Sequence, residues 1–463
     1  MKLKKYINYL TIACLLIVIS GCAKQDEWLE AKNQKSLVVP ETLADYQAIL
    51  DDYNTIIEHN TIAGLLGTDN YFLTQNVFNT LSQVQRNLYT WDKIVWDTDR
   101  SVDWENSYKI VEYTNIVIDG LSKMENKSSS EYKFILGQAY FLRAMAFYNL
   151  AQIFCKPYAA SSASTDLGIP LRTTSDVNIL FERATVSETY TRIIGDAETA
   201  ADLLPEYIVS INRASKIAAH ALLSKAYLLK AEYAQAALYA DQVLKAKSSL
   251  MDFNSRLADL NTTYRFPASG RDNPEIIFFG NGYGYSAIVP GPAAPAFVDT
   301  LLMNSYAEHD LRKNFFYITD QASGYKRFCG TYSGTGALFS GLATNEILLI
   351  RAECRSRAGN ISGAIADLNL LLKNRISRDV FTPITSIENV LKTILSERRK
   401  ELPFTANIRW EDLRRLNLDN STAISTSRRL ENVQYDLLPN DPKYVLPIPN
   451  NEIQLSGLIQ NPR

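Results

Sequence analysis

Two segments decide the fold, KAYLLKAEYAQAALYADQVLK at residues 225–245 and RAECRSRAGNISGAIADLNLLLK at residues 351–373. They align as two copies of one pattern, and the turn of the second copy is two residues longer. The matched positions are Ala226, Ala236 and Leu244 in the first copy and Ala352, Ala364 and Leu372 in the second. Small residues allow two antiparallel helices to cross closely, and the large apolar residues give each copy a face to bury. Because one hairpin cannot bury that face alone, the copies are expected to stack on each other or on another element.

This repeat resembles the tetratricopeptide helix pair, and a generic helical hairpin is the alternative for each copy taken alone. A further helix is predicted at residues 134–154, where small and apolar residues recur every three to four positions. It is apolar nearly all round and is therefore expected to be buried. The predicted fold class is mainly α, with tetratricopeptide-like helix pairs that form an α-α superhelical scaffold.

The segments between these helices have a different composition. Residues 157–172 are rich in Ser, Ala and Pro, and residues 262–341 are rich in Gly, Pro and aromatic residues with little helical period. The sequence NPEIIFF at 273–279 predicts a turn and a short strand, and NGYGY at 281–285 predicts a mobile turn that carries two rings. We expect an irregular, loop-rich subdomain with short β-strands, and loops on a rigid scaffold are where ligands usually bind.

The N-terminus is typical of a secretory leader that ends at a cysteine. A basic start, Met1 to Lys5, precedes an apolar stretch at residues 9–19 that is too short for a comfortable membrane span. The sequence Ile19-Ser20-Gly21-Cys22 resembles a bacterial lipobox, so we expect residues 1–21 to be a lipoprotein signal peptide and Cys22 to carry the lipid. An ordinary secretory signal with an incidental cysteine is the alternative.

Composition argues against several other classes of protein. Lys plus Arg (48) nearly equals Asp plus Glu (50), so the net charge of −2 gives no reason to expect nucleic acid or an anionic membrane surface as a partner. After the leader, only Cys155, Cys329 and Cys354 follow Cys22, and their wide spacing suggests neither a disulfide framework nor a metal site. The three histidines, His59, His220 and His309, are too scattered to suggest a zinc or Ser-His site.

The C-terminal segment carries a charged and aromatic signature, with ERRKELPF at 397–404, RWEDLRR at 409–415 and YVLPIP at 444–449. Glu397 and Glu401 are one helical turn apart, which would place both carboxylates on one face of a helix. Because several arginines surround them, we expect a buried hydrogen-bonded network rather than the general acid and base of a glycosidase. The sequence therefore disfavours an enzyme.

These motifs, in this order and after a lipobox, closely resemble the SusD/RagB family of outer-membrane nutrient-uptake lipoproteins. The resemblance covers nearly the whole chain, and its other positions are VPETLADY at 39–46, Trp104, Tyr108, Asn115, Arg143, NPEIIF at 273–278, Tyr306 and Asp310-Leu311-Arg312. One departure is Thr405-Ala406-Asn407, where family members commonly carry a Glu-Gly pair. This departure puts the packing of a tight turn in question.

The resemblance implies one SusD-like domain at residues 22–463, with an N-terminal part at about 22–210 and a tetratricopeptide-like, loop-rich part at about 211–463. It implies a lipid-anchored protein of the cell outer membrane, facing the exterior, with no cofactor, metal or catalytic residue. Such a protein captures an oligosaccharide or polysaccharide, or in the RagB branch a peptide, and passes it to a TonB-dependent (SusC-like) transporter. The polar residues after Cys22, at 23–27, resemble the matching export signal.

Sugar rings stack on aromatic side chains, so the region after the first helices and the loop region supply the candidate binding residues. These candidates are Asp69, Tyr71, Trp91, Trp96, Tyr283 and Tyr285. Alternatively, Trp91 and Trp96 are core residues of one amphipathic element. A helical-repeat scaffold that binds another protein and has no ligand of its own is the remaining alternative.

Overall fold

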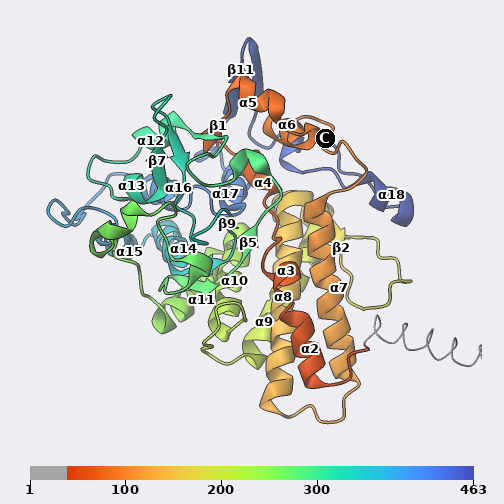
Figure 1. Cartoon of the computed structure of the whole chain (residues 1–463). Coiled ribbons are helices and arrows are strands. Elements are labelled where there is room, and N and C mark those ends of the chain that lie inside the picture. The colour runs from red at the N-terminus through yellow and green to blue at the C-terminus, as the bar shows by residue number, and fades with distance from the viewer. Residues whose placement is uncertain (1–38) are drawn as a thin grey trace, which may run out of the picture.

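The computed structural model describes residues 39–463, and helices form most of its regular structure (Figure 1). The predicted signal peptide and Cys22 lie outside the described residues and stay predictions. The helices of the first half are α2 (Leu43–Leu50), α3 (Tyr53–Ile56), α4 (Ala63–Leu66), α5 (Gln75–Thr80), α6 (Gln83–Tyr89), α7 (Val102–Ser122), α8 (Ser130–Phe154) and α9 (Val186–Leu203). Those of the second half are α10 (Lys216–Leu229), α11 (Tyr233–Ala246), α12 (Thr300–Asn304), α13 (Arg312–Phe316), α14 (Thr344–Arg357), α15 (Ile361–Lys373), α16 (Val390–Glu401), α17 (Ile408–Leu416) and α18 (Asn450–Ser456).

The strands are short and form six antiparallel pairs. The pairs are β1 (Tyr71–Phe72) with β6 (Phe297–Val298), β2 (Leu167–Pro170) with β3 (Arg183–Thr185), β4 (Ile276–Phe278) with β10 (Leu342–Ala343), β5 (Asn281–Gly282) with β9 (Leu338–Phe339), β7 (Tyr317–Thr319) with β8 (Lys326–Phe328), and β11 (Thr426–Leu430) with β12 (Val433–Leu437). Four of the pairs involve residues 262–341, which confirms the expected subdomain with short strands. The strand predicted within 273–279 is β4, whereas Asn281 and Gly282, expected in a turn, form β5.

The long helices pack one against the next through the chain. Helix α7 packs on α8, α8 on α9, α9 on α10, α10 on α11, α11 on α14, and α14 on α15 (Figure 1). The two predicted hairpins are therefore α10–α11 and α14–α15, and they stack on each other through α11 and α14. This confirms the predicted helix-pair scaffold.

Helix α8 forms the centre of the N-terminal half. It begins four residues before the predicted start because the Ser129 side chain caps its N-terminus, and it is buried along most of its length. The Arg143 guanidinium on α8 pairs with Asp196 of α9 at 2.7 Å and donates to Asn115 of α7 at 2.9 Å. At the other end of α8, Arg414 of the C-terminal signature donates to the carbonyl oxygens of Gln152 and Cys155. A buried cation thus satisfies carbonyl groups that the end of the helix leaves free.

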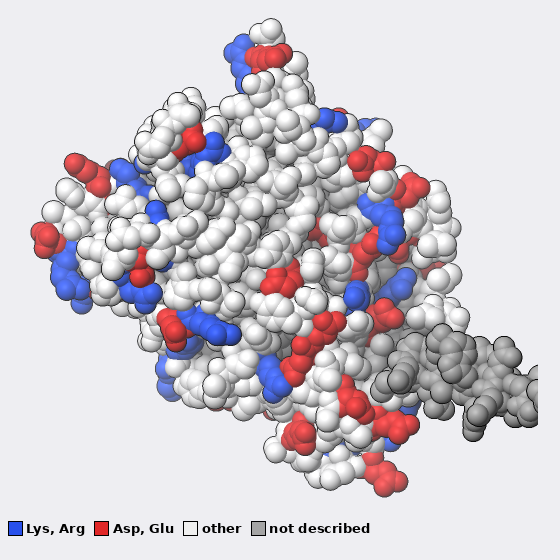
Figure 2. All heavy atoms as spheres, in the orientation of Figure 1, with Lys and Arg blue, Asp and Glu red and all other residues white. Residues whose placement is uncertain are grey.

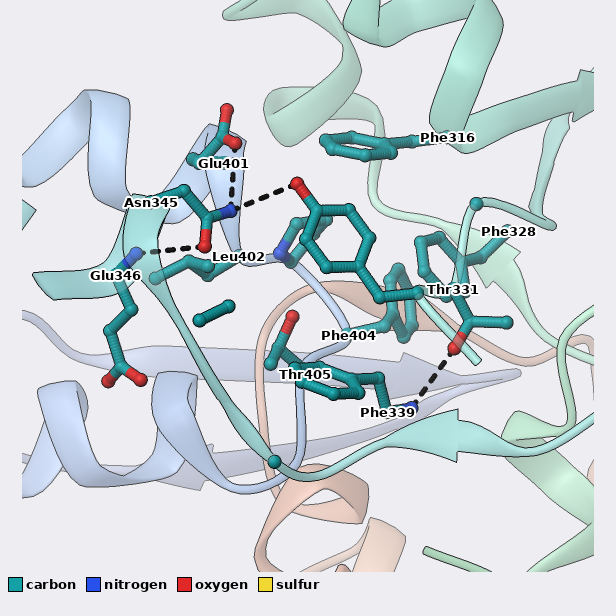
Figure 3. A pocket seen from close by; sticks show the side chains of 15 residues that line it. Phe316, Phe328, Thr331, Phe339, Asn345, Glu346, Glu401, Leu402, Phe404 and Thr405 are labelled. Atoms are coloured by element: carbon teal, nitrogen blue, oxygen red, sulfur yellow. Dashed lines mark hydrogen bonds between the residues drawn. The ribbon is translucent and has the colours of Figure 1, made fainter. Parts of the chain in front are cut away.

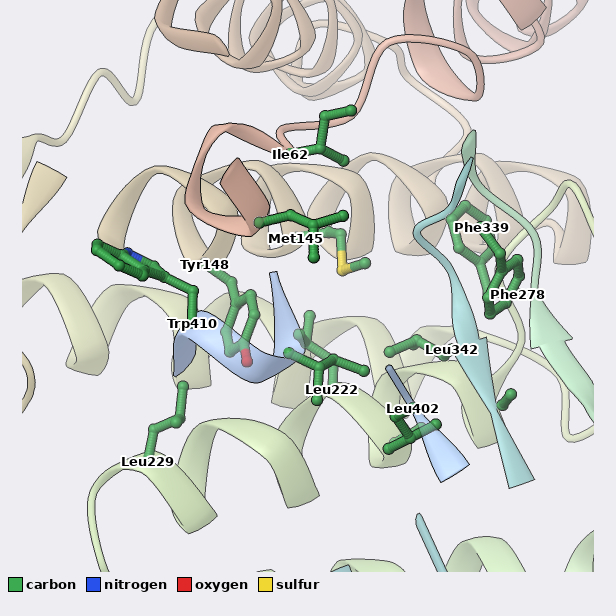
Figure 4. Packing of buried hydrophobic residues seen from close by; sticks show 14 of the residues in the cluster. Ile62, Met145, Tyr148, Leu222, Leu229, Phe278, Phe339, Leu342, Leu402 and Trp410 are labelled. Atoms are coloured by element: carbon green, nitrogen blue, oxygen red, sulfur yellow. The ribbon is translucent and has the colours of Figure 1, made fainter. Parts of the chain in front are cut away.

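The core is continuous between the two halves (Figure 4). Trp410 of the signature is 1% exposed and packs against α4, where a Cβ on Gly64 or Gly67 would come within 2.6 Å of its ring. Only glycine leaves room for the indole at these two positions. The RWEDLRR segment therefore holds the N-terminal helices against the second half through shape as well as through charge.

The signature carboxylates form the buried network that their spacing predicts. Glu397 pairs with Arg312 at 2.7 Å and with Lys400, while Glu401 pairs with Arg375 at 2.8 Å. All these groups are buried, and every carboxylate is neutralised by a cation. The structural interpretation of Glu397 and Glu401 is confirmed, because neither carboxylate faces an open cleft.

Candidate functional site

The structure does not bring the six predicted binding residues together on one surface. Tyr71, Trp91, Trp96 and Tyr285 are all less than 8% exposed and have no free ring face. The predicted arc of exposed aromatic residues is therefore not formed by these four side chains. The alternative that placed Trp91 and Trp96 in the core agrees with their burial.

Each buried candidate already has a partner within the protein. The Arg428 guanidinium lies over the rings of Tyr71 and Trp91, at 5.0 and 4.6 Å from their centres. Trp96 donates its indole N–H to the Pro447 carbonyl oxygen at 2.8 Å, and Tyr285 donates its hydroxyl to Asp103. Burial and an internal partner fit these residues for packing rather than for contact with a ligand.

Asp69 is partly buried and belongs to an ion-pair cluster. Its carboxylate lies 2.7 Å from Arg409 and 3.2 Å from Arg399. Burial alone would raise its pKa, but the two arginines outweigh burial and lower it. Its oxygens are thus committed to the two arginines of the signature.

Tyr283 is the one candidate whose ring is open to solvent, with 40% of the residue exposed. It belongs to a group of polar and aromatic side chains on the loop-rich face, here called the Tyr283 surface: Tyr53, Glu58, His59, Tyr264, Tyr283 and Thr335. The His59 ring lies 6.2 Å from the Tyr283 ring at a tilt of 45°. Tyr53 is 38% exposed, so two phenol rings are accessible here.

Sequence reasoning missed Tyr53, Glu58, His59, Tyr264 and Thr335 as members of this surface. Tyr53 to His59 lie in and after α3, while Tyr264 and Thr335 lie in separate loops. No motif joins these segments in the sequence. The only available signal was the frequency of tyrosine in the loop region.

The loop that carries Tyr283 is held on both sides. Before it, β5 pairs with β9, and the Asn281 N–H donates to the Ile57 carbonyl oxygen at 2.7 Å. A Cβ on Gly282 would lie 2.2 Å from Ile62, so glycine is required for this close approach. After it, the buried Tyr285 ring and its bond to Asp103 fix the chain, while Gly284 adopts φ = +118°, a conformation that favours glycine. The Tyr283 ring is therefore positioned by rigid neighbours. The turn at 281–285, which was predicted to be mobile, is fixed at both of its ends.

Burial and neighbouring groups raise the pKa of two phenols of the Tyr283 surface, Tyr53 and Tyr283. Burial, followed by the neighbouring Glu58, raises the pKa of Tyr53 to about 12. Burial also raises the pKa of Tyr283, and the nearby Thr335 acts in the opposite direction. Glu58 accepts a hydrogen bond from the Asn281 side chain at 3.1 Å. Phenol and carboxyl groups can exchange hydrogen bonds with hydroxyl groups of a ligand.

The surface around these elements carries few charged side chains. Figure 2 shows that Lys, Arg, Asp and Glu gather mainly toward the edges of the face on which α4, β5 and β9 lie. Such a face suits a ligand that binds through ring stacking and hydrogen bonds.

An internal cavity beside β9 is too small for a ligand. Its walls include Phe316, Phe339, Glu401 and Phe404, and its volume is about 20 Å³, enough for about one water molecule (Figure 3). Asn345 also lines the cavity, and its side-chain amide donates to Glu401 at 2.9 Å and to the Tyr332 hydroxyl at 3.2 Å. We assign this cavity to the core.

Neither a metal-ligand cluster nor an exposed thiol occurs in the described part of the chain. Within residues 39–463, no three His, Cys, Asp or Glu side chains are grouped so that they could hold a metal ion. Cys155, Cys329 and Cys354 are buried free thiols. None of the helices in these residues combines the length and the apolar composition needed to cross a membrane.

Stacked helix pairs that carry an exposed aromatic loop define a helical-repeat protein. Comparison of the sequence with protein-family models identifies the family. Residues 27–228 match the SusD-like family described as "Starch-binding associating with outer membrane", and residues 344–463 match the SusD family. The chain belongs to the SusD/RagB family.

Individual relatives agree with this assignment. The chain is 25% identical to SusD-like protein P2 of Formosa agariphila, with 99% of each chain covered. A SusD superfamily protein from Bacteroides thetaiotaomicron has the same fold, with a TM-score of 0.76 and 22% identity over 91% of this chain and 100% of that one. The surface glycan-binding protein A from Bacteroides fluxus is similar as well, with a TM-score of 0.70 and 19% identity over 91% of this chain and 100% of that one. At these identities, the solved structures establish the fold alone.

Proposed function

We propose that this protein is a lipoprotein of the outer membrane that faces the cell exterior, captures a nutrient glycan and delivers it to a partner TonB-dependent transporter. The observation that carries the proposal is the exposed Tyr283 ring on a loop held on both sides. The apolar C–H faces of a sugar stack on such a ring, and Tyr53, Glu58 and Thr335 would meet its hydroxyl groups. No catalytic group is required for this function.

Binding by stacking and a few hydrogen bonds is reversible, which suits a protein that must release its ligand to a transporter. The lipid on Cys22 would keep the protein at the membrane where the transporter lies. Support for the membrane location comes from the family description and from the lipobox. A Cys22→Ser variant should leave the membrane fraction, and retention of that variant would contradict the lipid anchor.

The ligand can be tested with residues 24–463, which lack Cys22. We expect saturable binding to one or more members of a glycan panel in calorimetry. Tyr283→Ala should weaken it about 5- to 150-fold, because loss of a stacking ring costs about 1–3 kcal/mol. The matched control is Tyr207→Ala, which removes another exposed tyrosine, between α9 and α10, and should leave binding unchanged.

Two other results would change the proposal. Binding to peptides alone would favour a RagB-type peptide carrier, which reads backbone groups rather than sugar faces. Absence of any ligand, together with recovery of a transporter in the same membrane complex, would favour a helical-repeat scaffold.

A further inference from the structure

A second, open cavity lies next to the Tyr283 surface. Its volume is about 750 Å³, and it lies between the loops at 260–265 and 292 and the β7–β8 hairpin. Its lining residues are Leu260, Arg265, Pro292, Asn314, Tyr317, Ile318, Thr319, Asp320, Gln321, Ala322 and Lys326. Tyr264 of the Tyr283 surface precedes Arg265, and its hydroxyl faces Gly291, which precedes Pro292. Adjacent residues thus line the surface and the cavity.

Arg265 on the wall of this cavity has no counter-charge within residues 39–463. Its Nε atom is buried without a hydrogen-bond partner, and among the described residues no carboxylate oxygen lies within 4 Å of its guanidinium. The nearby Cys329 does not compensate, because burial raises the pKa of its thiol to about 11 although Arg265 acts to lower it. A guanidinium remains charged at every physiological pH, so this charge is left for an anion to neutralise.

The other charges of the cavity also leave an excess of positive charge. The Lys326 ammonium donates to the neutral Thr319 hydroxyl at 2.6 Å. The single carboxylate in the lining, Asp320, is 3.0 Å from Arg327 and accepts hydrogen bonds from Ser323. Since Arg327 neutralises Asp320, the charges of Arg265 and Lys326 remain available.

We infer that this cavity binds an anionic substituent, a carboxylate or a sulfate ester, of a glycan whose neighbouring sugar lies on the Tyr283 surface. Arg265 and Lys326 would pair with the anion, while Asn314 and Gln321 offer amide groups to the adjoining hydroxyls. This inference rests on the proposed function and narrows its ligand to an acidic glycan. A neutral glycan would leave the Arg265 charge uncompensated.

The test compares matched ligands by calorimetry. One pair is an oligogalacturonate and its methyl ester, and the other is a sulfated galactan oligosaccharide and its desulfated form, so the two pairs distinguish carboxylate from sulfate. We expect the charged member of at least one pair to bind 10-fold or more tightly than its neutral partner. The affinity of the charged member should also fall when NaCl is raised from 50 to 500 mM.

Variants assign the effect to the cavity. Arg265→Gln and Lys326→Gln should each weaken binding of the charged ligand about 10- to 100-fold and leave the neutral ligand unchanged. Arg271→Gln, which removes an exposed arginine outside the cavity lining, is the matched control and should change neither. Thermal melting establishes that each variant is folded, and if Arg265→Gln does not fold, Lys326→Gln and the salt dependence still decide the result.

The possible outcomes separate this inference from the proposed function. Equal binding of charged and neutral glycans, unaffected by Arg265→Gln or Lys326→Gln, would overturn the inference while glycan capture at Tyr283 stands. If no glycan of either kind binds, the proposed function and the inference are both wrong.

Discussion

The Arg428 guanidinium lies 4.6 Å from the centre of the Trp91 ring, and this contact fixes the β11–β12 hairpin to the N-terminal half. The same guanidinium lies 3.9 Å from the centre of the Tyr89 ring and donates to the carbonyl oxygens of Leu66, Thr68 and Tyr89. Aromatic side chains that could have stacked on a sugar thus enclose a cation of the protein itself.

Replacement of Arg428 should therefore destabilise the fold. Arg428→Met leaves the buried carbonyl groups of Thr68 and Tyr89 without a donor, while Leu66 keeps the hydrogen bond from Tyr71, and it removes the cation from the aromatic rings. We therefore expect the free energy of unfolding to fall by about 3 kcal/mol or more. Urea unfolding measures this change. Arg429→Met alters the next, exposed arginine and should stay within about 0.5 kcal/mol of the parent protein. Equal effects of the two substitutions would contradict the structural role of Arg428.

The two tyrosines that follow β5, Tyr283 and Tyr285, should respond differently to loss of their hydroxyl groups. Tyr285→Phe removes a donor to the buried Asp103 carboxylate and is expected to cost about 1–3 kcal/mol of stability. Tyr283→Phe keeps the exposed ring and should leave the stability unchanged. Chemical denaturation of both variants checks this prediction. A larger loss of stability in Tyr283→Phe than in Tyr285→Phe would contradict the assignment of Tyr285 as the buried, hydrogen-bonded residue.

Acid should destabilise the protein through the signature network. Burial alone would raise the pKa of Glu397, but Arg312 and Lys400 outweigh burial and hold it below its ordinary value of 4.5. The folded state then binds this proton less tightly than the unfolded chain. The stabilisation is therefore complete above pH 4.5 and is lost as the pH falls through the lower folded value.

Urea unfolding between pH 6 and pH 3 tests this expectation with Glu397→Gln. At pH 6 the variant should be less stable by about 3–5 kcal/mol, because Arg312 loses one of its buried partners. Its stability should fall less steeply with acidification than that of the parent protein. Glu388→Gln, at an exposed position, is the control and should follow the parent curve. Parallel curves for Glu397→Gln and the parent would show that Glu397 does not carry the acid sensitivity.

The departure from the family pattern at Thr405-Ala406-Asn407 is visible in the backbone. Ala406 has φ = +42°, a conformation that costs a residue with a Cβ about 1–2 kcal/mol, whereas glycine adopts it freely. Glycine also loses more entropy on folding, so Ala406→Gly should raise the free energy of unfolding by about 0.5–1 kcal/mol.

A helical alanine provides the control for Ala406. Ala366→Gly, at an exposed position within α15, should lower the stability by about 1 kcal/mol. Urea unfolding of the two variants should thus give changes of opposite sign. A loss of stability in both would indicate that the turn is not strained at Ala406.

Much of the fold could be predicted from local patterns. The repeat at 225–245 and 351–373 predicted two helix pairs, because helical periodicity and small residues at a helix crossing can be recognised within about 20 residues of sequence. The spacing of Glu397 and Glu401 among arginines predicted the buried network for a similar reason. The segment 281–282 was expected in a turn, yet it forms β5, because its partner β9 lies far away in the sequence.

The candidate site was less predictable, because exposure is not a local property. Trp91 and Tyr283 both lie in segments without regular structure, but Arg428 lies over the Trp91 ring, whereas Tyr283 keeps 40% of its surface exposed. Likewise, no pattern near Arg265 shows that its charge lacks a partner, since a partner could come from any part of the chain.

The sequence by itself determined the helix pairs, the charged signature and the family resemblance, since each depends on residue types at fixed short spacings. Only the tertiary structure decided which aromatic rings face solvent, which carboxylates are neutralised and which cations of residues 39–463, such as Arg265, have no carboxylate partner. The physical reason is that burial and charge compensation depend on distances in space between segments such as Trp91 and Arg428, which chain folding brings together and sequence spacing does not record.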